Sequence, residues 1–154
     1  MAKGKLIVIY GINNLGKTTQ ARLLIQALTQ KGINASYLKY PLYELEPSGP
    51  LLNDYLRKGN PFGLSSRESQ IVYILNRTQY DSELRQRLER GDWVVAEDYT
   101  GTGLAWGMDG GVARDFLERL SVHLLKEDLA FLFEGKRFLE AREQQHLHEQ
   151  NDEL

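Results

Sequence analysis

The sequence predicts an α/β fold in which a parallel sheet of four strands carries helices on both faces. Short apolar runs alternate along the chain with stretches of helical periodicity, and a glycine-rich loop joins the first run to the first helical stretch. A strand, a glycine loop, a helix and a second strand in this order form a βαβ unit, whose strands run parallel. The length of 154 residues suits one domain with one core. We therefore expect a single domain over residues 1–154.

The first βαβ unit comes at the start of the chain. Residues 6–10, LIVIY, form a continuous apolar run, which is typical of a strand buried on both faces of a sheet. From Lys17 onward, apolar residues recur at helical spacing until Gly32 ends the helix. Residues 33–40 are predicted as a second strand, which Pro41 terminates.

The middle of the chain is predicted to be largely helical. Three prolines and a glycine indicate a loop over residues 41–50, and residues 51–58 are expected to form a short helix. Ser65 and Glu68 have the spacing of a capping box, so a long helix is expected to begin there and to run to about Arg90. One stripe of this helix is predicted from helical spacing at Ile71, Ile74, Leu75 and Thr78.

Two further strands are predicted in the second half, at residues 93–96 and 128–133. Between them, five glycines in residues 100–111 indicate a mobile loop or a backbone that approaches a ligand closely. Residues 113–126 are expected to form a helix. Residues 134–154 turn polar, and no further strand or apolar helix is predicted there. The resulting sheet is lean, and the alternative is that the chain is a fragment of a longer protein.

One motif carries most of the chemistry. Residues 11–18, GINNLGKT, match the pattern G-x-x-x-x-G-K-[ST] of the phosphate-binding loop (P-loop), between an apolar strand and an amphipathic helix. The glycines let backbone amides curl toward phosphate oxygens, and the helix N-terminus favours negative charge. Lys17 is expected to contact the β- and γ-phosphates of ATP, and the Thr18 hydroxyl to bind Mg²⁺. The ATP-binding residues predicted in this way are Gly11, Ile12, Asn13, Asn14, Leu15, Gly16, Lys17, Thr18 and Thr19.

Two carboxylates, Glu97 and Asp98, follow the third apolar run. They come at the carboxyl end of a predicted parallel strand, where open α/β sheets bind their ligands. In P-loop enzymes a carboxylate at this place orders Mg²⁺ or its water shell. We expect one of the two to do so, which makes Glu97 a candidate metal ligand together with Thr18. The pattern itself does not decide between Glu97 and Asp98.

Two further sets of side chains have alternative interpretations. Tyr73, Arg77 and Tyr80 share one side of the long helix and could stack on a planar base and hydrogen-bond its edge, but an amphipathic boundary has the same spacing. Arg137 and Arg142 are cations on the polar segment. They could close over a triphosphate as a lid and stabilise charge in the transition state, or they could form a solvated surface.

Composition excludes several kinds of site and partner. The absence of cysteine excludes disulfides, zinc–thiolate sites, iron–sulfur clusters and cysteine nucleophiles. Because 19 Lys and Arg stand against 21 Asp and Glu, the composition does not favour a nucleic-acid polymer as partner. The first apolar run is too short for a signal peptide or a membrane span. We therefore expect a cytoplasmic protein with no membrane partner.

Residues 5–149 resemble the thymidylate kinase family. Residues 16–20 are similar to the family's GKTTQ opening, and Tyr40 with Pro41 is similar to its aromatic–proline pair after the second strand. The resemblance implies a P-loop domain like that of nucleoside monophosphate kinases, with three layers, α/β/α, that uses ATP and Mg²⁺. It further implies that residues 135–149 form a lid, that the family's last strand and helix are missing, and that homodimers are to be expected.

The resemblance also implies an acceptor site. Tyr73 stands where the family has an aromatic residue that stacks on thymine, and Arg77 where it has an arginine that reads the edge of this base. Thr102 matches the serine of the family's DRYxxSxxAY stretch, and Trp106 matches the aromatic residue beside the sugar. The substrate-binding residues implied in this way are Asn13, Tyr40, Tyr73, Arg77, Tyr99, Thr102 and Trp106. The implied catalytic residues are Lys17, Glu97, Asp98, Arg137 and Arg142.

Three positions depart from the family's pattern. Asn13 replaces an aspartate that contacts the sugar 3′-hydroxyl, and Asp98 replaces the arginine that grips the acceptor phosphate. A further arginine, usual shortly after the aromatic–proline pair, has no counterpart in residues 42–50. Exchanging an arginine fork for a carboxylate removes a bidentate phosphate donor and introduces repulsion. Arg77, a lid arginine or Mg²⁺ would have to compensate.

The expected function is that of an ATP-dependent nucleoside monophosphate kinase that converts dTMP into dTDP. Two alternatives remain. A deoxynucleoside kinase needs no arginine clamp, and a carboxylate could act as the base for the sugar hydroxyl. A non-catalytic nucleotide-binding P-loop module would bind ATP without transferring phosphate.

Overall fold

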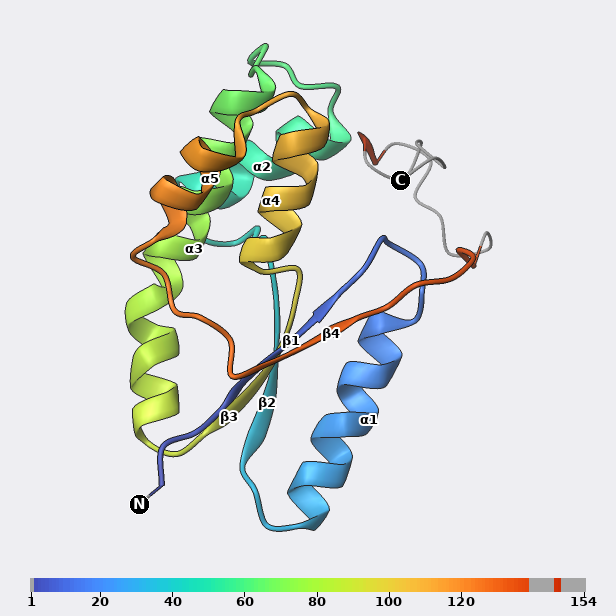
Figure 1. Ribbon diagram of the computed structural model, residues 1–154, viewed down its shortest axis with the longest axis vertical. Coiled ribbons are helices and arrows are strands. Elements are labelled where there is room, and N and C mark those ends of the chain that lie inside the picture. The colour runs from blue at the N-terminus through green and yellow to red at the C-terminus, as the bar shows by residue number, and fades with distance from the viewer. Residues whose placement is uncertain (1, 139–145, 148–154) are drawn as a thin grey trace.

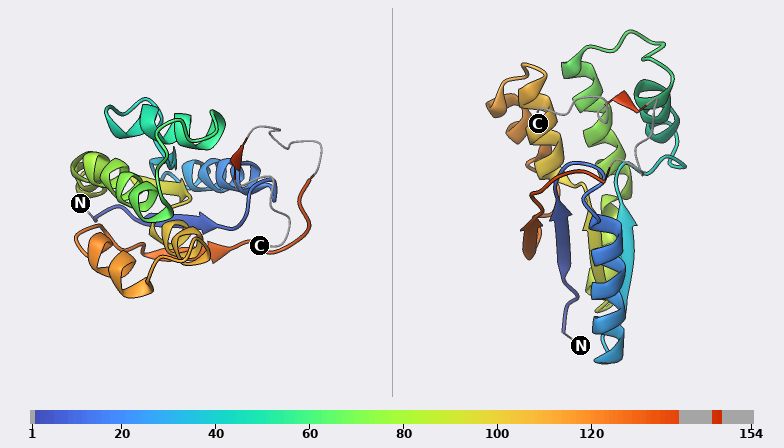
Figure 2. Two further views of the ribbon diagram at one scale, coloured as in Figure 1. Left: turned by 90° about the horizontal axis from the view of Figure 1, so that it is seen from above. Right: turned by 90° about the vertical axis from the view of Figure 1, so that its right-hand side faces the viewer.

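A four-stranded parallel sheet forms the centre of the structure, a computed structural model that describes residues 2–138 and 146–147. The strands are β1 (Leu6–Tyr10), β2 (Ala35–Lys39), β3 (Trp93–Glu97) and β4 (Leu129–Leu132). They lie in the order β2–β3–β1–β4, and each neighbouring pair is parallel. The right-hand view of Figure 2 shows the strands side by side in this order. The predicted α/β fold with four parallel strands is confirmed.

Helices lie on both faces of the sheet and beyond one of its ends (Figure 1). They are α1 (Lys17–Gln30), α2 (Ser48–Arg57), α3 (Ser66–Glu89), α4 (Thr100–Asp109) and α5 (Arg114–Ser121). α1 covers one face, and the C-terminal half of α3 covers the other. α2, α4 and α5 gather beyond the carboxyl ends of β2 and β3, which is the end where open α/β sheets bind ligands. Within the described part of the chain, no helix is both long and apolar enough to cross a membrane.

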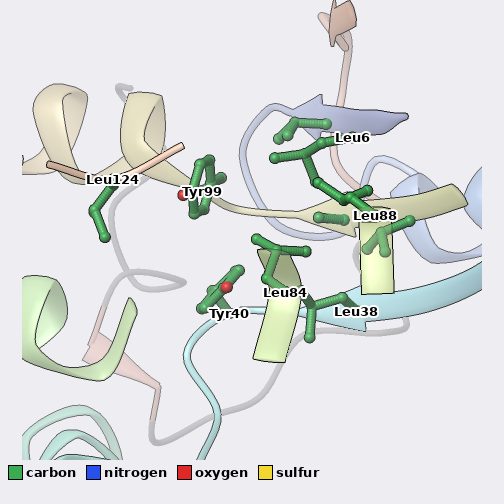
Figure 3. Packing of buried hydrophobic residues seen from close by; sticks show 10 residues of the cluster. Leu6, Leu38, Tyr40, Leu84, Leu88, Tyr99 and Leu124 are labelled. Carbon is green, nitrogen blue, oxygen red and sulfur yellow. The ribbon is translucent and has the colours of Figure 1, made fainter. Parts of the chain in front are cut away.

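The core has a cluster on each face of the sheet because β1 and β3 are buried on both sides. Leu6 and Val8 of β1 pack with Leu84 and Leu88 of α3, in the cluster drawn in Figure 3. Ile9 belongs instead to the cluster beneath α1. Successive side chains of a strand point to opposite faces, so a strand between two helical layers must be apolar at every position. The continuous apolar runs of the sequence have this cause.

α3 begins with the predicted capping box. The Ser65 Oγ accepts a hydrogen bond from the Glu68 N–H at 3.2 Å, and the Ser65 N–H donates to Glu68 Oε2 at 2.8 Å. The predicted stripe is wrong in part: Ile74 is buried, but Ile71 and Leu75 are 43% and 40% exposed. The N-terminal half of α3 faces α2, α4 and a polar cavity, so its buried side is largely polar. The buried residues of this half are Ser69, Gln70, Tyr73, Ile74, Asn76 and Arg77.

The bounds of most predicted elements differ from the observed ones by one or two residues, and two elements differ by more. Residues 48–50, predicted as loop, form the first turn of α2. Pro50 is tolerated there because amides of a first helical turn have no partner within the helix. α5 is shorter than the predicted helix over residues 113–126, since the chain turns after Ser121 and brings Leu124 into the core on the α3 side.

The predicted glycine-rich loop over residues 100–111 is wrong, because most of it forms α4. Its glycines make room for neighbouring side chains. A Cβ on Gly103 would lie 2.9 Å from Arg77 Nη1, and a Cβ on Gly107 would lie 2.6 Å from Leu117 Cδ1. These glycines therefore let α3 and α5 approach α4 closely. From composition alone, glycines that serve close packing cannot be distinguished from glycines of a mobile loop.

β4 is the least buried strand of the sheet. It forms the edge next to β1, and its four residues are exposed, Leu132 by 68%. Figure 2 shows this edge strand standing clear of α1. Its pairing with β1 places Phe133, the residue after β4, against the loop that follows β1.

Candidate functional site

A cavity of about 510 Å³ opens at the carboxyl ends of β1, β2 and β3. The loop between β1 and α1, the residues after β2, the N-terminal half of α3 and the residues after β3 line it. Residues predicted for ATP and residues predicted for the acceptor thus face one space. The predicted residues that line it are Gly11, Ile12, Asn13, Asn14, Gly16, Lys17, Thr18, Thr19, Tyr40, Tyr73, Arg77, Glu97, Asp98, Thr102 and Trp106.

The loop between β1 and α1 has the shape of an anion nest. Gly11, Asn14 and Gly16 have positive φ angles of 137°, 65° and 82°. Left-handed residues among right-handed ones turn successive N–H groups toward one centre. Gly16 caps α1 without any side-chain hydrogen bond, so the first N–H groups of the helix are available to a ligand. A Cβ on Gly11 would lie 2.7 Å from the Phe133 carbonyl oxygen, which restricts this position to glycine.

Lys17 is buried at the mouth of this loop. Its Nζ donates hydrogen bonds to the Gly11 and Ile12 carbonyl oxygens at 2.6 and 2.9 Å and lies 3.7 Å from Asp98 Oδ1. Burial lowers the pKa of Lys17, and the charges of Asp98 and Glu97 oppose this effect. Carbonyl oxygens and a carboxylate therefore hold the ammonium group. A bound phosphate would compete with these oxygens for the ammonium hydrogens or would become a further acceptor beside them.

Thr18 and Glu97, the two predicted metal ligands, both interact with one tyrosine. The Tyr37 hydroxyl donates to Glu97 Oε1 at 2.7 Å, and Thr18 lies near enough to the same hydroxyl to lower its pKa. Burial and the neighbouring Glu97 carboxylate raise the pKa of Tyr37. Glu97 is almost fully buried, and Lys39 Nζ lies 3.9 Å from its Oε2.

Asp98 occupies a strained position between β3 and α4. Its φ of 62° lies in the left-handed region, which asparagine and aspartate tolerate better than most residues. Thr102, one turn into α4, donates its hydroxyl to Asp98 Oδ1 at 3.3 Å. Burial raises the pKa of Asp98, although Lys17 acts in the opposite direction. A carboxylate thus faces the loop where the family's pattern has an arginine.

The opposite wall of the cavity comes from α3. The Arg77 guanidinium lies 5.9 Å from the centroid of the Tyr73 ring, and both side chains are buried. The Tyr73 ring meets Tyr55 of α2 edge to face, with centroids 6.4 Å apart. Burial lowers the pKa of Arg77. An aromatic ring beside a desolvated guanidinium suits a planar, polar ligand.

Some predicted site residues lie elsewhere. Leu15 and Tyr99 do not line the cavity. Tyr99 packs in the core beside Tyr40, as Figure 3 shows. The centroids of the two rings lie 5.3 Å apart. Arg137 is half-buried and is also not part of the cavity wall. Arg142 lies outside the described residues.

Most of the predicted lid, residues 135–149, also lies outside the described part of the chain. Its described beginning crosses the phosphate-binding loop. The Phe138 N–H donates to the Asn14 carbonyl oxygen at 2.8 Å, and the Phe138 ring lines the cavity near Gly16.

Sequence reasoning missed several residues of the cavity wall. Lys39 ends β2 at the same edge as Glu97, and Gln70 precedes Tyr73 by three residues on one side of α3, so strand position and helical spacing could have found both. Arg57 comes from α2 and stacks on Tyr43 at 4.6 Å, a contact between two elements that no local pattern predicts. The missed residues include Lys39, Tyr43, Arg57, Gln70, Gly103, Phe138 and His146.

Comparisons with known proteins agree on one family. The family model described as thymidylate kinase matches residues 9–153. The chain is 31% identical over 104 residues to the thymidylate kinase of Plasmodium falciparum, covering 68% of this chain and 48% of that protein. It is 29% identical over 133 residues to human thymidylate kinase, covering 86% of this chain and 61% of that protein. The chain thus spans about half the length of the first relative and about three fifths of the length of the second.

A solved structure extends the similarity to three dimensions. Thymidylate kinase from Candida albicans matches with a TM-score of 0.70 at 25% sequence identity. The match covers 87% of this chain and 64% of that chain. The structural similarity therefore extends over most of this chain.

Proposed function

Because the chain belongs to the thymidylate kinase family, we propose that it is an ATP-dependent nucleoside monophosphate kinase that converts dTMP into dTDP. One observation carries this proposal: a phosphate-binding loop with a buried lysine and a buried ring with its arginine line a single cavity. Phosphoryl transfer needs little covalent chemistry from a protein. It needs two substrates held in line and neutralisation of charge on the transferred group.

The donor side fits the triphosphate of ATP. The nest formed by Gly11, Asn14 and Gly16, the uncapped N-terminus of α1 and the Lys17 ammonium together present donors to an anion. Thr18 and Glu97 offer a hydroxyl and a carboxylate near the Tyr37 hydroxyl, the hard oxygen donors that suit Mg²⁺. Bound with ATP, Mg²⁺ would neutralise charge on the β- and γ-phosphates. Glu97 shares the Tyr37 neighbourhood with Thr18, which favours Glu97 over Asp98 as the residue that would order the metal.

The acceptor side suits a nucleoside monophosphate, but the cations available to its phosphate differ from those of the family's pattern. Tyr73 and Arg77 would bind the base, and Thr102 and Trp106, which line the same cavity, would lie beside the rest of the acceptor. Asp98 cannot donate to the acceptor phosphate. Two other cations that line the cavity, Lys39 and Arg57, would supply the positive charge in its place.

The environment of Asp98 also favours a second candidate, a deoxynucleoside kinase. A buried carboxylate with a raised pKa beside Lys17 could accept the proton of a sugar hydroxyl. An acceptor without phosphate would not suffer charge repulsion from this carboxylate. The two candidates differ only in which acceptor is consumed.

A coupled assay of ADP release tests the proposal with dTMP, the other nucleoside monophosphates and thymidine offered side by side. We expect turnover with dTMP, and loss of turnover in Lys17→Ala because the transferred phosphate loses its buried cation. Lys31→Ala, an exposed lysine just after the same helix, is the matched control. Turnover with thymidine alone would favour the second candidate, and ATP binding without any transfer would favour a non-catalytic module.

A further inference from the structure

Two polar side chains of the cavity wall are buried without a full set of hydrogen-bond partners. Gln70 is 3% exposed and Arg77 is 4% exposed. Among the described residues, Gln70 Oε1 and Arg77 Nε have no hydrogen-bond partner. Buried polar atoms are nearly always paired in native proteins, because an unpaired one has lost its water without compensation. Since both side chains line the cavity, a ligand is the natural source of the missing partners.

The two groups converge on one place. They lie on the same side of α3, separated by two helical turns, with Tyr73 between them. A Cβ built on Gly103 would lie 2.9 Å from Arg77 Nη1 and 3.3 Å from Gln70 Oε1, and these distances together bound the separation of the two atoms at about 6.2 Å. The absence of a side chain at Gly103 therefore lets both groups lie close to α4 at the same point. A donor and an acceptor stand side by side there, next to an aromatic ring.

From this arrangement we infer that Gln70 determines base specificity, with Gln70 Oε1 accepting a hydrogen bond from a ring N–H while Arg77 donates to the neighbouring carbonyl oxygen. The inference rests on the proposed function, in which the base of the acceptor occupies this part of the cavity. Thymine and uracil carry a carbonyl oxygen beside a ring N–H and satisfy both groups. Cytosine carries an amino group beside a ring nitrogen with a lone pair, so it would set a donor against the Arg77 cation and a lone pair against Gln70 Oε1.

Binding of nucleosides separates this inference from the kinase activity. Thymidine presents the thymine edge and 2′-deoxycytidine presents the cytosine edge, and neither carries a phosphate. Ligand-observed NMR titrations give the dissociation constants of both nucleosides. We expect the wild type to prefer thymidine. In Gln70→Met, which has a similar length and no acceptor oxygen, we expect thymidine affinity to fall roughly tenfold and most of the preference to disappear. Gln86→Met, an exposed glutamine of the same helix, is the control and should keep both.

A second variant and a second measurement exclude a merely structural role. Gln70→Glu keeps an acceptor oxygen and loses the amide donor, so the thymidine preference should stay the same or increase. The thermal midpoint of ligand-free Gln70→Met should equal or exceed that of the wild type, because the variant buries no unpaired acceptor. A thymidine preference that is unchanged in Gln70→Met, or lost in Gln70→Glu, would overturn the inference and leave the proposed function intact. A wild type that binds ATP but neither nucleosides nor their monophosphates would instead refute the proposed function, and this inference with it.

Discussion

Asp98 faces the phosphate-binding loop, and replacing it by asparagine tests the charge balance of the donor site. A phosphate oxygen that hydrogen-bonds to Lys17 Nζ at about 2.8 Å can lie no more than about 6.5 Å from Asp98 Oδ1, because the Lys17–Asp98 distance is 3.7 Å. At an effective dielectric constant of about 20, one phosphate charge at this distance is repelled by roughly 2.5 kcal/mol. Asp98→Asn should therefore tighten ATP binding in the absence of Mg²⁺ by about 70-fold.

The structure favours asparagine for this test. Asparagine tolerates the left-handed backbone of position 98, and its amide oxygen can still accept the Thr102 hydroxyl. Lys17 keeps its hydrogen bonds to two loop carbonyl oxygens, so the loop should retain its shape. The change thus removes a charge and little else.

Calorimetric titration of ATP, with EDTA and then with Mg²⁺, measures the effect. The difference between wild type and Asp98→Asn should shrink when Mg²⁺ is present, because the metal offsets the phosphate charge that Asp98 repels. Asp115→Asn, at an exposed site on α5, is the matched control and should behave like the wild type. Equal or weaker Mg²⁺-free binding by Asp98→Asn would refute the reasoning.

Three further predictions concern acidity, the acceptor wall and stability. Burial raises the folded-state pKa of Asp98, so the stabilising contribution of this group is present below its ordinary pKa and is lost as the pH rises through the raised value. At pH 7, Asp98→Asn should therefore have a higher free energy of unfolding than the wild type, and this advantage should disappear on acidification. Urea unfolding at a series of pH values measures the difference. Gly103→Ala should weaken dTMP binding at least tenfold with ATP binding unchanged, since its Cβ would lie 2.9 Å from Arg77 Nη1. Titrations with both nucleotides measure this, and an equal loss of dTMP and ATP affinity would contradict the prediction. Ser65→Ala should lower the free energy of unfolding by about 1 kcal/mol through loss of the α3 cap, and an unchanged urea midpoint would argue against that cap.

Local patterns predicted the elements whose causes are local. The apolar run of β1 is buried on both faces, the Ser65–Glu68 spacing forms its capping box, and the loop before α1 adopts a nest. Each of these depends on residues within a few positions of one another. A prediction from sequence is dependable where the residues that cause a structure all lie within the motif itself.

The misread segments have causes that are distant in sequence. Gly103 and Gly107 belong to a helix because α3 and α5 approach it closely, and a glycine count cannot separate such packing from a flexible loop. Ile71 and Leu75 are exposed although their spacing is that of a buried stripe, because the buried side of α3 at this level faces a polar cavity. Periodicity gives the faces of a helix but does not say which face a neighbour will cover.

By itself the sequence determined the succession of the four strands along the chain, the phosphate-binding loop and the carboxylates at the end of β3, because backbone preferences and short spacings encode them directly. Tertiary structure alone decided that Gln70 and Arg77 lie together against Gly103, that the Tyr37 hydroxyl donates to Glu97, and that Tyr99 belongs to the core. Those arrangements depend on how helices from separate parts of the chain are packed around the sheet. Their distances are set by the sizes of the side chains between them, which no single segment contains.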